Sequence, residues 1–395
     1  MIVIGLMSGT SYDGIEAAAG DLEIEGNVLV LRPLAERNVA YPDELRRDIA
    51  AVLPPATTTV GHVCELDVRI GQCFAEAAEA IQRAVHDDAQ LVVSHGQTLF
   101  HWVEDGRARG SLQVGQAAWI AELTGLPVVS DLRTRDIAAG GQGAPMVAKF
   151  DALMLAGATS RCAALNLGGI ANLTVVEAGR EPLAYDIGPA NALIDAAVHH
   201  FSQGRQRLDR DGRRATSGRV HEPLLAELMS DPYYAAPPPK PTGKERFNLT
   251  YLLSALERHS SIPEDDVIAT VTALTATVVA TELKRLKVAE VFASGGGTAN
   301  RTLMSDLARR APDVNIRTTE VWGLPSSAKE AYAFATLGFL TVNGHPGALP
   351  SCTGARRATL LGSITPGAQP LSLAPSAPAP VRLRIEASRA GASGT

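Results

Sequence analysis

The chain opens with the run Ile2-Val3-Ile4-Gly5-Leu6-Met7-Ser8-Gly9-Thr10-Ser11-Tyr12-Asp13-Gly14, in which apolar residues lead directly into a turn of Gly, Ser and Thr. The apolar part predicts a short buried strand. A Gly-Ser-Thr turn after a strand presents backbone N–H groups and hydroxyls to an anion. An ordinary β-hairpin turn is an equally good interpretation of the same residues. No Walker A motif occurs in the chain, so this turn is not a P-loop.

Strands alternate with helices along the rest of the sequence, and Gly-rich turns repeatedly follow a strand. This order is typical of α/β sheets, in which ligands bind beyond the carboxyl ends of the strands. The turns form one group before about residue 135 and another after about residue 140, so we expect two sheets that face one cleft. Apolar spacing predicts strands at 2–4, 91–93, 126–129, 162–167 and 288–293, and helices at 66–85, 114–123, 191–201, 267–278 and 329–340.

Composition excludes several classes of protein. Hydrophobic residues make up 46% and charged residues 20% of 395 residues, which excludes a mainly disordered chain. A formal charge of −6 and only 5% aromatic residues argue against nucleic acid as a partner. Four scattered cysteines predict neither a zinc ribbon nor a disulfide scaffold. We recognise no signal peptide and no uninterrupted apolar span, so we expect a cytoplasmic protein without a membrane partner.

Two further turns are rich in glycine. Gly168-Gly169 lies within Asn166–Thr174, and Gly295-Gly296-Gly297 lies within Ser294–Asn300. Glycine lets a flat or charged ligand approach the backbone closely. Each turn is weak evidence by itself, but three such turns favour a nucleotide, with two turns at its phosphates and the third at the nucleoside.

Polar side chains near strand ends are the candidates for chemistry. Asp186 precedes a predicted helix and is either a general base or a residue that caps that helix. Arg133 could hold a carboxylate with a bidentate guanidinium, or it could join surface ion pairs with nearby aspartates. His95 and Gln97 suit sugar hydroxyls, although a lone histidine is more often structural.

Taken in order, these motifs resemble those of the anhydro-N-acetylmuramic acid kinase family. The resemblance implies a two-lobed fold of the sugar kinase and actin-like ATPase type with a central cleft. It also implies ATP and Mg²⁺ as cofactors and 1,6-anhydro-N-acetylmuramic acid, an amino sugar of cell-wall recycling, as substrate. The motifs are GLMSGTSYDGIE at 5–16, SHGQT at 94–98, DLRTRDIAAGGQGAP at 131–145, NLGGIANLT at 166–174, YDIGPANALID at 185–195, SGGGTAN at 294–300, KEAYAFATLGFL at 329–340 and PSCTGA at 350–355.

The resemblance also implies a reaction and its residues. The enzyme would hydrolyse the 1,6-anhydro bond and phosphorylate the freed 6-oxygen, giving N-acetylmuramic acid 6-phosphate and ADP. The catalytic residues would be Asp186 and Glu330, the sugar would contact His95, Gln97 and Arg133, and Asp13 would help to place Mg²⁺. The nucleotide would be bound by Gly9, Thr10, Ser11, Tyr12, Asp13, Gly14, Ile15 and Glu16, by Gly168 and Gly169, and by Gly295, Gly296 and Gly297.

The sequence departs from the family pattern at a few positions. Ile187 and Ala190 stand where the family usually has Thr and Gly, which puts the fine geometry beside Asp186 in doubt, and Glu16 stands where Asp is commoner. Two alternatives stay open: another sugar or carboxylate kinase of the same superfamily, and an actin-like nucleotide-binding protein without catalysis. A homodimer is also left open.

We expect an N-terminal lobe over residues 1–135 and a C-terminal lobe over residues 136–365. The first lobe would hold the first phosphate loop and part of the sugar site. The second would hold the other phosphate loop, Asp186 and the adenosine loop. Residues 366–395, rich in Ala, Pro, Ser and Gly, predict a disordered tail. The run Pro237-Pro238-Pro239-Lys240-Pro241 predicts a stiff, extended loop.

Overall fold

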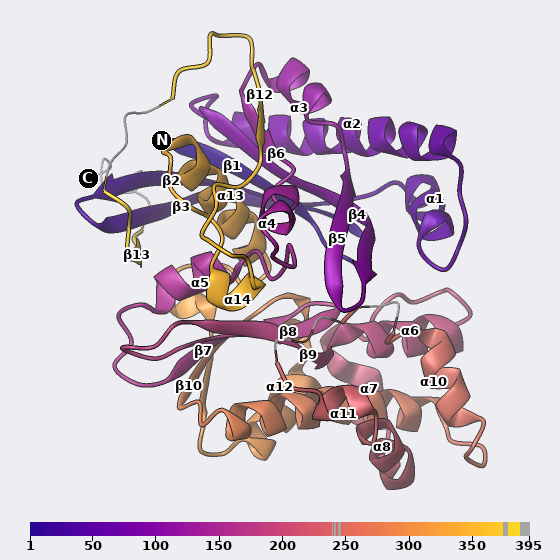
Figure 1. Cartoon of the computed structure of the whole chain (residues 1–395). Helices are drawn as coiled ribbons and strands as arrows, with labels where there is room; N and C mark the ends of the chain where they lie inside the picture. Colours follow the sequence, from indigo (N-terminus) through magenta and orange to yellow (C-terminus); the bar gives the residue numbers. More distant parts are fainter. Residues whose placement is uncertain (239, 241, 244–245, 374–377, 388–395) are drawn as a thin grey trace, which may run out of the picture. The chain divides into compact units, whose positions relative to one another are not determined.

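The computed structural model describes residues 1–238, 240, 242–243, 246–373 and 378–387 (Figure 1). The chain forms two compact units: unit 1 is Met1–Gly157 with Glu320–Thr395, and unit 2 is Ala158–Thr319. Each unit combines helices with one β-sheet, which confirms the predicted α/β class. The cleft expected between two lobes stays a prediction.

Unit 1 is built on a sheet whose described strands number eight. Their order is β12-β6-β4-β1-β2-β3-β13, with β5 paired to β4. β1, β2 and β3 are successive antiparallel neighbours, whereas β4 runs parallel to β1 and β13 runs parallel to β3. The strands are β1 (Ile2–Ser8), β2 (Gly14–Glu25), β3 (Val28–Ala40), β4 (Leu91–Glu104), β5 (Arg107–Val114), β6 (Val128–Ser130), β12 (Ser363–Thr365) and β13 (Arg382–Ile385).

Two long helices, α2 and α13, cover opposite faces of this sheet. Successive side chains of a strand point to opposite faces. Ile4 and Leu6 of β1 accordingly belong to the core formed with α2, and Gly5 between them faces α13. A Cβ atom at Gly5 would lie 1.9 Å from the carbonyl oxygen of Ala331, so α13 lies directly on the strand. The helices are α1 (Asp43–Val52), α2 (Val60–Ala84), α3 (Ala117–Thr124), α4 (Thr134–Ala138), α5 (Ala148–Leu155), α13 (Lys329–Val342) and α14 (Pro350–Thr353).

Unit 2 is built on a sheet with the strand order β11-β10-β7-β8-β9. β7, β8 and β9 form an antiparallel meander, and β10 runs parallel to both β7 and β11. The strands are β7 (Cys162–Leu167), β8 (Ile170–Val176), β9 (Leu183–Pro189), β10 (Glu290–Ser294) and β11 (Asn315–Thr318). The helices are α6 (Asn191–Phe201), η1 (Arg210–Gly212), α7 (Arg213–Ser217), α8 (Glu222–Met229), α9 (Pro232–Ala235), α10 (Leu249–Leu256), α11 (Glu264–Arg285), η2 (Gly296–Ala299) and α12 (Arg301–Arg310), and η3 (Thr319–Trp322) spans the boundary to unit 1.

Helix α11 has the length and composition of a membrane-spanning helix. However, 83% of its most apolar 18-residue window is buried within the structure. Val271, Leu274 and Val278 pack in the core with helices of the same unit. A buried core helix passes the same test as a membrane span, so α11 carries little weight as evidence for a membrane.

The division into units differs from the predicted boundary at 135/136. Unit 1 continues to Gly157 and takes up the chain again from Glu320. Helix α13 belongs to unit 1 because Gly5 of β1 has no side chain, which lets the helix pack directly on the first sheet. Apolar spacing predicts that a segment is helical, but it does not indicate which sheet the helix covers.

The predicted disordered tail is wrong for part of its length. Residues 382–385 form β13, whose four residues pair in parallel with Val28–Leu31 of β3. Leu383 is buried, and Glu386 accepts a hydrogen bond of 3.0 Å from Arg32. Backbone pairing with β3 and the contact between Glu386 and Arg32 thus order a segment whose composition alone suggested a coil. Residues 374–377 and 388–395 of the predicted tail lie outside the described residues.

Candidate active site

The first predicted phosphate loop is the tight connection of a β-hairpin. β1 ends at Ser8 and β2 begins at Gly14, with Met7 paired to Glu16 across the hairpin. Between them, the amide of Tyr12 donates to the carbonyl of Gly9 at 3.1 Å. The stretch is therefore a β-hairpin turn, and its binding of phosphate stays a prediction. Gly14, Ile15 and Glu16 belong to the strand rather than to the loop.

Gln97 supports this loop from the neighbouring strand β4. Its side chain is completely buried, and its amide nitrogen donates to the carbonyl of Gly9 at 3.3 Å. Its amide oxygen accepts a 2.7 Å hydrogen bond from the Ser8 hydroxyl. These contacts indicate that Gln97 holds the loop in place. Its predicted contact with the sugar stays a prediction. The segment 94–98 lies inside β4, which corrects the expectation that the strand ends at residue 93.

His95, which is buried, and Arg133, which is half-buried, form a hydrogen-bonded pair in unit 1. The Arg133 Nε donates to His95 Nε2 at 3.0 Å, and its Nη1 donates to the carbonyl of Gly143 at 2.7 Å. The other ring nitrogen, His95 Nδ1, lies 2.9 Å from the carbonyl of Gly96, which accepts its proton. Burial, and secondarily the Arg133 charge, lower the pKa of His95 to about 3. His95 is therefore neutral at pH 7 and orients the guanidinium rather than exchanging protons.

A group of carboxylates lies beside this pair. Burial raises the pKa of Glu16 well above its ordinary value, and the charges of Glu330 and Asp13 raise it further. Burial also raises the pKa of Glu330, while Lys329 and Arg133 lower it. Like charges brought together in this way favour a bound cation or a retained proton. The structure thus brings Asp13, Glu16, Glu330 and Arg133 into one electrostatic neighbourhood.

Sequence reasoning did not identify a buried ion pair next to Glu330. Lys329 and Asp151 are each 2% exposed at the side chain, and the Nζ–Oδ1 distance is 2.5 Å. A lysine in the first turn of a helix opposes the helix dipole, so its burial there requires the carboxylate. The two residues are 178 positions apart, and no spacing signal in the sequence connects them.

In unit 2, the second and third glycine turns lie against each other. The Gly168-Gly169 turn joins β7 to β8, and the Asn191 side chain donates to the carbonyls of Leu167 and Gly168 at 3.0 and 2.8 Å. A Cβ atom at Gly297 would lie 2.7 Å from the Cβ of Leu167, so this close approach requires glycine. The structure therefore brings together two turns that are about 130 residues apart in the chain.

Gly295 and Gly296 have different environments within the third turn. Gly295 has φ = +86°, which only glycine adopts easily, and its ideal Cβ position lies 2.5 Å from Asn166 Oδ1. The ideal Cβ position of Gly296 has no neighbouring heavy atom within 4 Å among the described residues. The open side of the turn is thus at Gly296, where a ligand could approach the backbone.

Asp186 lies in the second half of β9 and is partly exposed. Its Oδ2 accepts a hydrogen bond of 3.0 Å from the amide of Thr242, and its carbonyl accepts one of 2.7 Å from the Tyr233 hydroxyl. The carboxylate does not cap α6, for which no side-chain cap is formed. Ile187 and Ala190, the two departures from the family pattern, are fully buried in the apolar core.

The described residues contain no cluster of three or more His, Cys, Asp or Glu side chains suited to a metal ion. Mg²⁺ in phosphate-transferring sites commonly keeps several waters and takes one or two carboxylates besides the phosphates. The carboxylates of Asp13 and Glu16 fit that smaller requirement, because the charge of Asp13 contributes to the raised pKa of Glu16.

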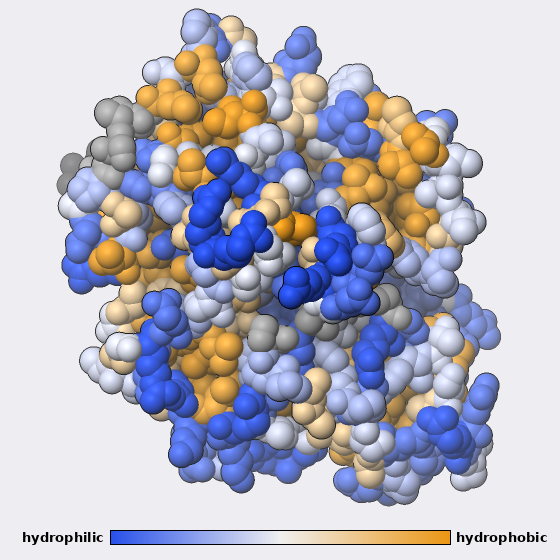
Figure 2. All heavy atoms as spheres, in the orientation of Figure 1, coloured by the Kyte–Doolittle hydropathy of each residue, from blue (hydrophilic) through white to orange (hydrophobic). Residues whose placement is uncertain are grey.

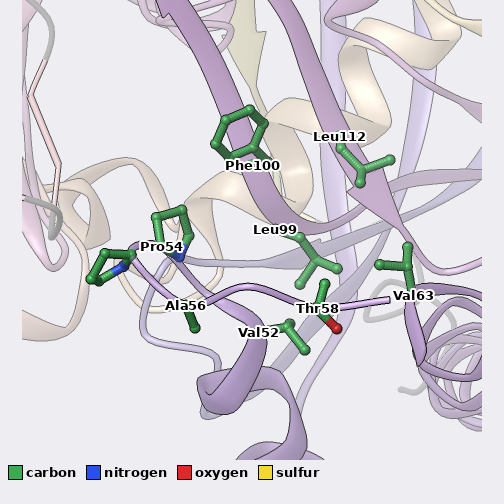
Figure 3. A pocket seen from close by; sticks show the side chains of 9 residues that line it. Val52, Pro54, Ala56, Thr58, Val63, Leu99, Phe100 and Leu112 are labelled. Atoms are coloured by element: carbon green, nitrogen blue, oxygen red, sulfur yellow. The ribbon is translucent and has the colours of Figure 1, made fainter. Parts of the chain in front are cut away.

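A separate apolar cavity of about 320 Å³ opens in unit 1 (Figure 3). It contains none of the predicted site residues, although Leu99 follows Gln97 by two positions in β4. Figure 2 shows hydrophobic residues at the surface in the region that Figure 1 assigns to α2 and the β4–β5 hairpin. The cavity is lined by Val52, Pro54, Pro55, Ala56, Thr58, Val63, Leu99, Phe100 and Leu112.

Comparison with known proteins decides the family. The family model described as anhydro-N-acetylmuramic acid kinase matches residues 1–367. The chain belongs to the anhydro-N-acetylmuramic acid kinase family. A protein of that name from Streptomyces coelicolor is 59% identical over 97% of this chain and 98% of its own length. Those from Streptomyces avermitilis and Rhodococcus erythropolis are 56% and 53% identical, over 98% of this chain and 100% of their own lengths.

The solved structures that match this chain are less similar to it than these relatives are. A ROK hexokinase from Thermus thermophilus is 17% identical and covers 86% of this chain and 99% of its own, with a TM-score of 0.32. The activator of 2-hydroxyisocaproyl-CoA dehydratase from Clostridium difficile is 13% identical, covers 86% of this chain and 97% of its own, and has a TM-score of 0.40. With scores this low, the description of the fold depends on the two sheets themselves.

Proposed function

We propose that the chain is an ATP-dependent kinase that hydrolyses the 1,6-anhydro bond of 1,6-anhydro-N-acetylmuramic acid and phosphorylates its 6-oxygen. The products are N-acetylmuramic acid 6-phosphate and ADP, and the role is in peptidoglycan recycling. The observation that carries the proposal is the family match over residues 1–367. The geometry of Asp186 supports the proposal, because its side chain is partly exposed and its carboxylate accepts a hydrogen bond from a backbone amide.

The proposed reaction has two steps, hydrolysis of the anhydro bond and transfer of the phosphoryl group. Asp186 takes a proton from water, and the water oxygen bonds to the anomeric carbon as the bond from that carbon to the 6-oxygen breaks. The 6-oxygen then bonds to the γ-phosphorus as its bond to the ADP oxygen breaks, and the proton on Asp186 passes to solvent. General-base assistance of this kind typically contributes roughly 10²–10⁴-fold.

The remaining residues bind and orient. Arg133, held by His95 and Gly143, would recognise the carboxylate of the substrate's lactyl group. The turn Gly9–Asp13 and the Gly168-Gly169 turn would bind phosphates through backbone N–H groups, and Gly295–Gly297 would bind the adenosine. Asp13, with Glu16 beside it, would hold Mg²⁺, which supplies charge neutralisation at the phosphates when bound. Glu330 would support the same carboxylate group.

Partners and location follow from this chemistry. The partners are ATP and a small amino sugar, and the formal charge of −6 gives no general attraction for nucleic acid. We expect the protein to work in the cytoplasm, where ATP is available, without a membrane partner. Whether it forms a homodimer stays open.

The test is a product analysis in H₂¹⁸O. The protein is incubated with ATP, Mg²⁺ and the anhydro sugar, and in parallel with N-acetylmuramic acid. The proposal expects a phosphorylated product only from the anhydro sugar, with one ¹⁸O at the anomeric position and none in the phosphate. Equal turnover of N-acetylmuramic acid would indicate the simpler sugar kinase, and ATP turnover without any sugar would indicate an actin-like protein.

A further inference from the structure

Tyr233 and Thr242 both contact Asp186 in unit 2. The Thr242 amide donates to Asp186 Oδ2 at 3.0 Å. The Tyr233 hydroxyl lies 2.7 Å from the carbonyl oxygen of Asp186 and 3.2 Å from that of Lys240. Asp186 is thus held at its carboxylate and at its backbone by residues 47 and 56 positions further along the chain.

Lys240, which lies between Tyr233 and Thr242 in the sequence, is held in place by contacts of its own. Its ammonium donates to the carbonyls of Tyr233 and Tyr234 at 3.1 and 3.0 Å, and it lies 4.0 Å from Glu282 Oε1. The Lys240 side chain is only 6% exposed. Burying a lysine is costly unless its donors are satisfied. Two carbonyl acceptors and a carboxylate at ion-pair distance around one ammonium therefore indicate a fixed anchor two residues before Thr242.

The ring of Tyr233 is fixed as firmly as its hydroxyl. The Lys240 ammonium lies 4.7 Å from the ring centroid, and Phe247 packs edge-on with a centroid distance of 5.7 Å. Tyr234, the next residue, stacks on Phe247, but its buried hydroxyl has no hydrogen-bond partner within the described part of the chain. The two adjacent tyrosines thus form a matched pair for comparison. The hydroxyl of Tyr233 donates to Asp186, whereas that of Tyr234 has no partner in the described residues.

We propose that Tyr233 and Lys240 are positioning residues that hold the carboxylate of Asp186 in the orientation needed to activate water. This inference builds on the proposed function, in which Asp186 is the base. Pro239 and Pro241, which belong to the loop predicted as stiff and extended, lie outside the described residues. Neither Tyr233 nor Lys240 is required to touch ATP or the sugar.

The test compares Tyr233→Phe and Lys240→Met with two matched controls. Tyr234→Phe removes a hydroxyl without a hydrogen-bond partner in the described residues, and Lys284→Met removes an exposed ammonium from the same unit. We expect kcat to fall about tenfold in Tyr233→Phe and about 10- to 100-fold in Lys240→Met. KM for ATP should stay within twofold of the wild-type value, and both controls should keep wild-type kcat.

Two results would overturn the inference. One is a kcat within twofold of wild type in Tyr233→Phe. The other is an unchanged kcat with a raised KM for ATP, which would make these residues part of nucleotide binding.

Hydrogen–deuterium exchange separates this inference from the proposed function, because it needs no turnover. The peptide that contains Thr242 should exchange faster in Tyr233→Phe than in wild type and in Tyr234→Phe. If wild type forms no phosphorylated sugar but this exchange difference is found, the positioning contacts stand and the proposed function fails. Equal exchange in all three proteins refutes the positioning contacts, whatever the activity.

Discussion

Asp186 is the residue on which the proposed chemistry depends. Asp186→Asn keeps the shape of the side chain and its ability to accept the Thr242 amide, but an amide does not take up a proton. We therefore expect kcat to fall roughly 10²–10⁴-fold, with little change in ATP affinity. ADP release and calorimetric ATP binding measure the two quantities. Asp313→Asn, at an exposed position of the same unit, is the control. Retention of near-normal turnover by Asp186→Asn would assign the base to another group.

The burial of His95 predicts how the stability of the protein depends on pH. Its folded-state pKa is about 3, against an ordinary value of 6.5. Between these values the unfolded chain binds a proton that the folded chain does not. The free energy of unfolding must therefore decrease as the pH falls from 6.5 toward 3, by up to about 1.4 kcal/mol per pH unit for one proton.

Urea unfolding at pH 6.5, 5.5 and 4.5 measures this contribution. His95→Asn should show a shallower loss of stability than wild type over this range. His86→Asn, in which an exposed histidine is replaced, should follow the wild-type slope. Parallel slopes for wild type and His95→Asn would show that the His95 ring is not kept neutral by burial.

Sequence motifs indicated candidate site residues but not the contacts that hold these residues in place. The quoted motifs include both His95 and Arg133, yet the bond between them depends on β4 passing beside residue 133. In the sequence, Lys329 stands out only as the residue before Glu330, and no pattern assigns a role to Asp151. Contacts such as Lys329–Asp151 arise from tertiary packing, which spacing along one chain does not encode.

At the scale of elements, the approach of α13 to the sheet places Glu330. A Cβ atom at Gly5 would overlap the carbonyl of Ala331, and one at Gly338 would lie 2.1 Å from Val93 Cγ2. Gly5→Ala must therefore push the helix away from β1. We expect a loss of about 1–3 kcal/mol in the free energy of unfolding, together with reduced kcat.

Chemical denaturation and ADP release measure the two effects of Gly5→Ala. Gly157→Ala is the matched control, since its ideal Cβ position meets no heavy atom within 4 Å among the described residues. If Gly5→Ala kept wild-type stability, the close packing of α13 on β1 would be wrong.

Strand β13 closes the edge of the unit 1 sheet beside β3. Arg32, 1% exposed, contacts Asp21, Glu23 and Glu386 at 3.2, 2.5 and 3.0 Å. Deleting residues 378–395 removes the backbone pairing, Leu383 and one of these carboxylates. We expect a loss of about one to two kcal/mol. Each kcal/mol lowers Tm by about 2–4 °C in a unit of this size, so Tm should fall by about 2–8 °C.

The control for this deletion removes only residues 388–395 and so retains β13. Calorimetry should give it the wild-type Tm. Equal Tm values for wild type and the longer deletion would show that β13 adds no stability in solution. The four residues of β13 alternate charged and apolar side chains, as in a half-buried strand, but this signal is short and lies within a segment rich in Pro and Ala that suggested a coil.

For the molecule as a whole, the order of elements was more predictable than their grouping. The strand at 162–167 and the helix at 191–201 were predicted at the bounds that the structure gives. The boundary predicted near 135 lies next to a glycine-rich stretch, Ala139–Pro145, and differs from the division of the chain after Gly157. In the structure this stretch packs within unit 1, where the amide of Gly143 donates to Asp136 and the Gln142 side chain bonds to β5. A glycine turn marks local backbone freedom and does not by itself mark the end of a domain.

Nucleotide binding should raise the thermal stability of the whole chain. A ligand that binds only the folded protein stabilises it by about 2.7 kcal/mol at 100 times its Kd, which corresponds to a rise in Tm of about 3 °C for a chain of 395 residues. Scanning calorimetry with ATP and Mg²⁺ should show this rise for wild type and for Asp186→Asn alike. Gly296→Val tests where the nucleotide binds, because a Cβ atom at Gly296 would meet no heavy atom within 4 Å in the described residues. It should therefore leave the ligand-free Tm unchanged but block the approach of adenosine and abolish the rise. A full rise with ATP in Gly296→Val would place the nucleotide elsewhere.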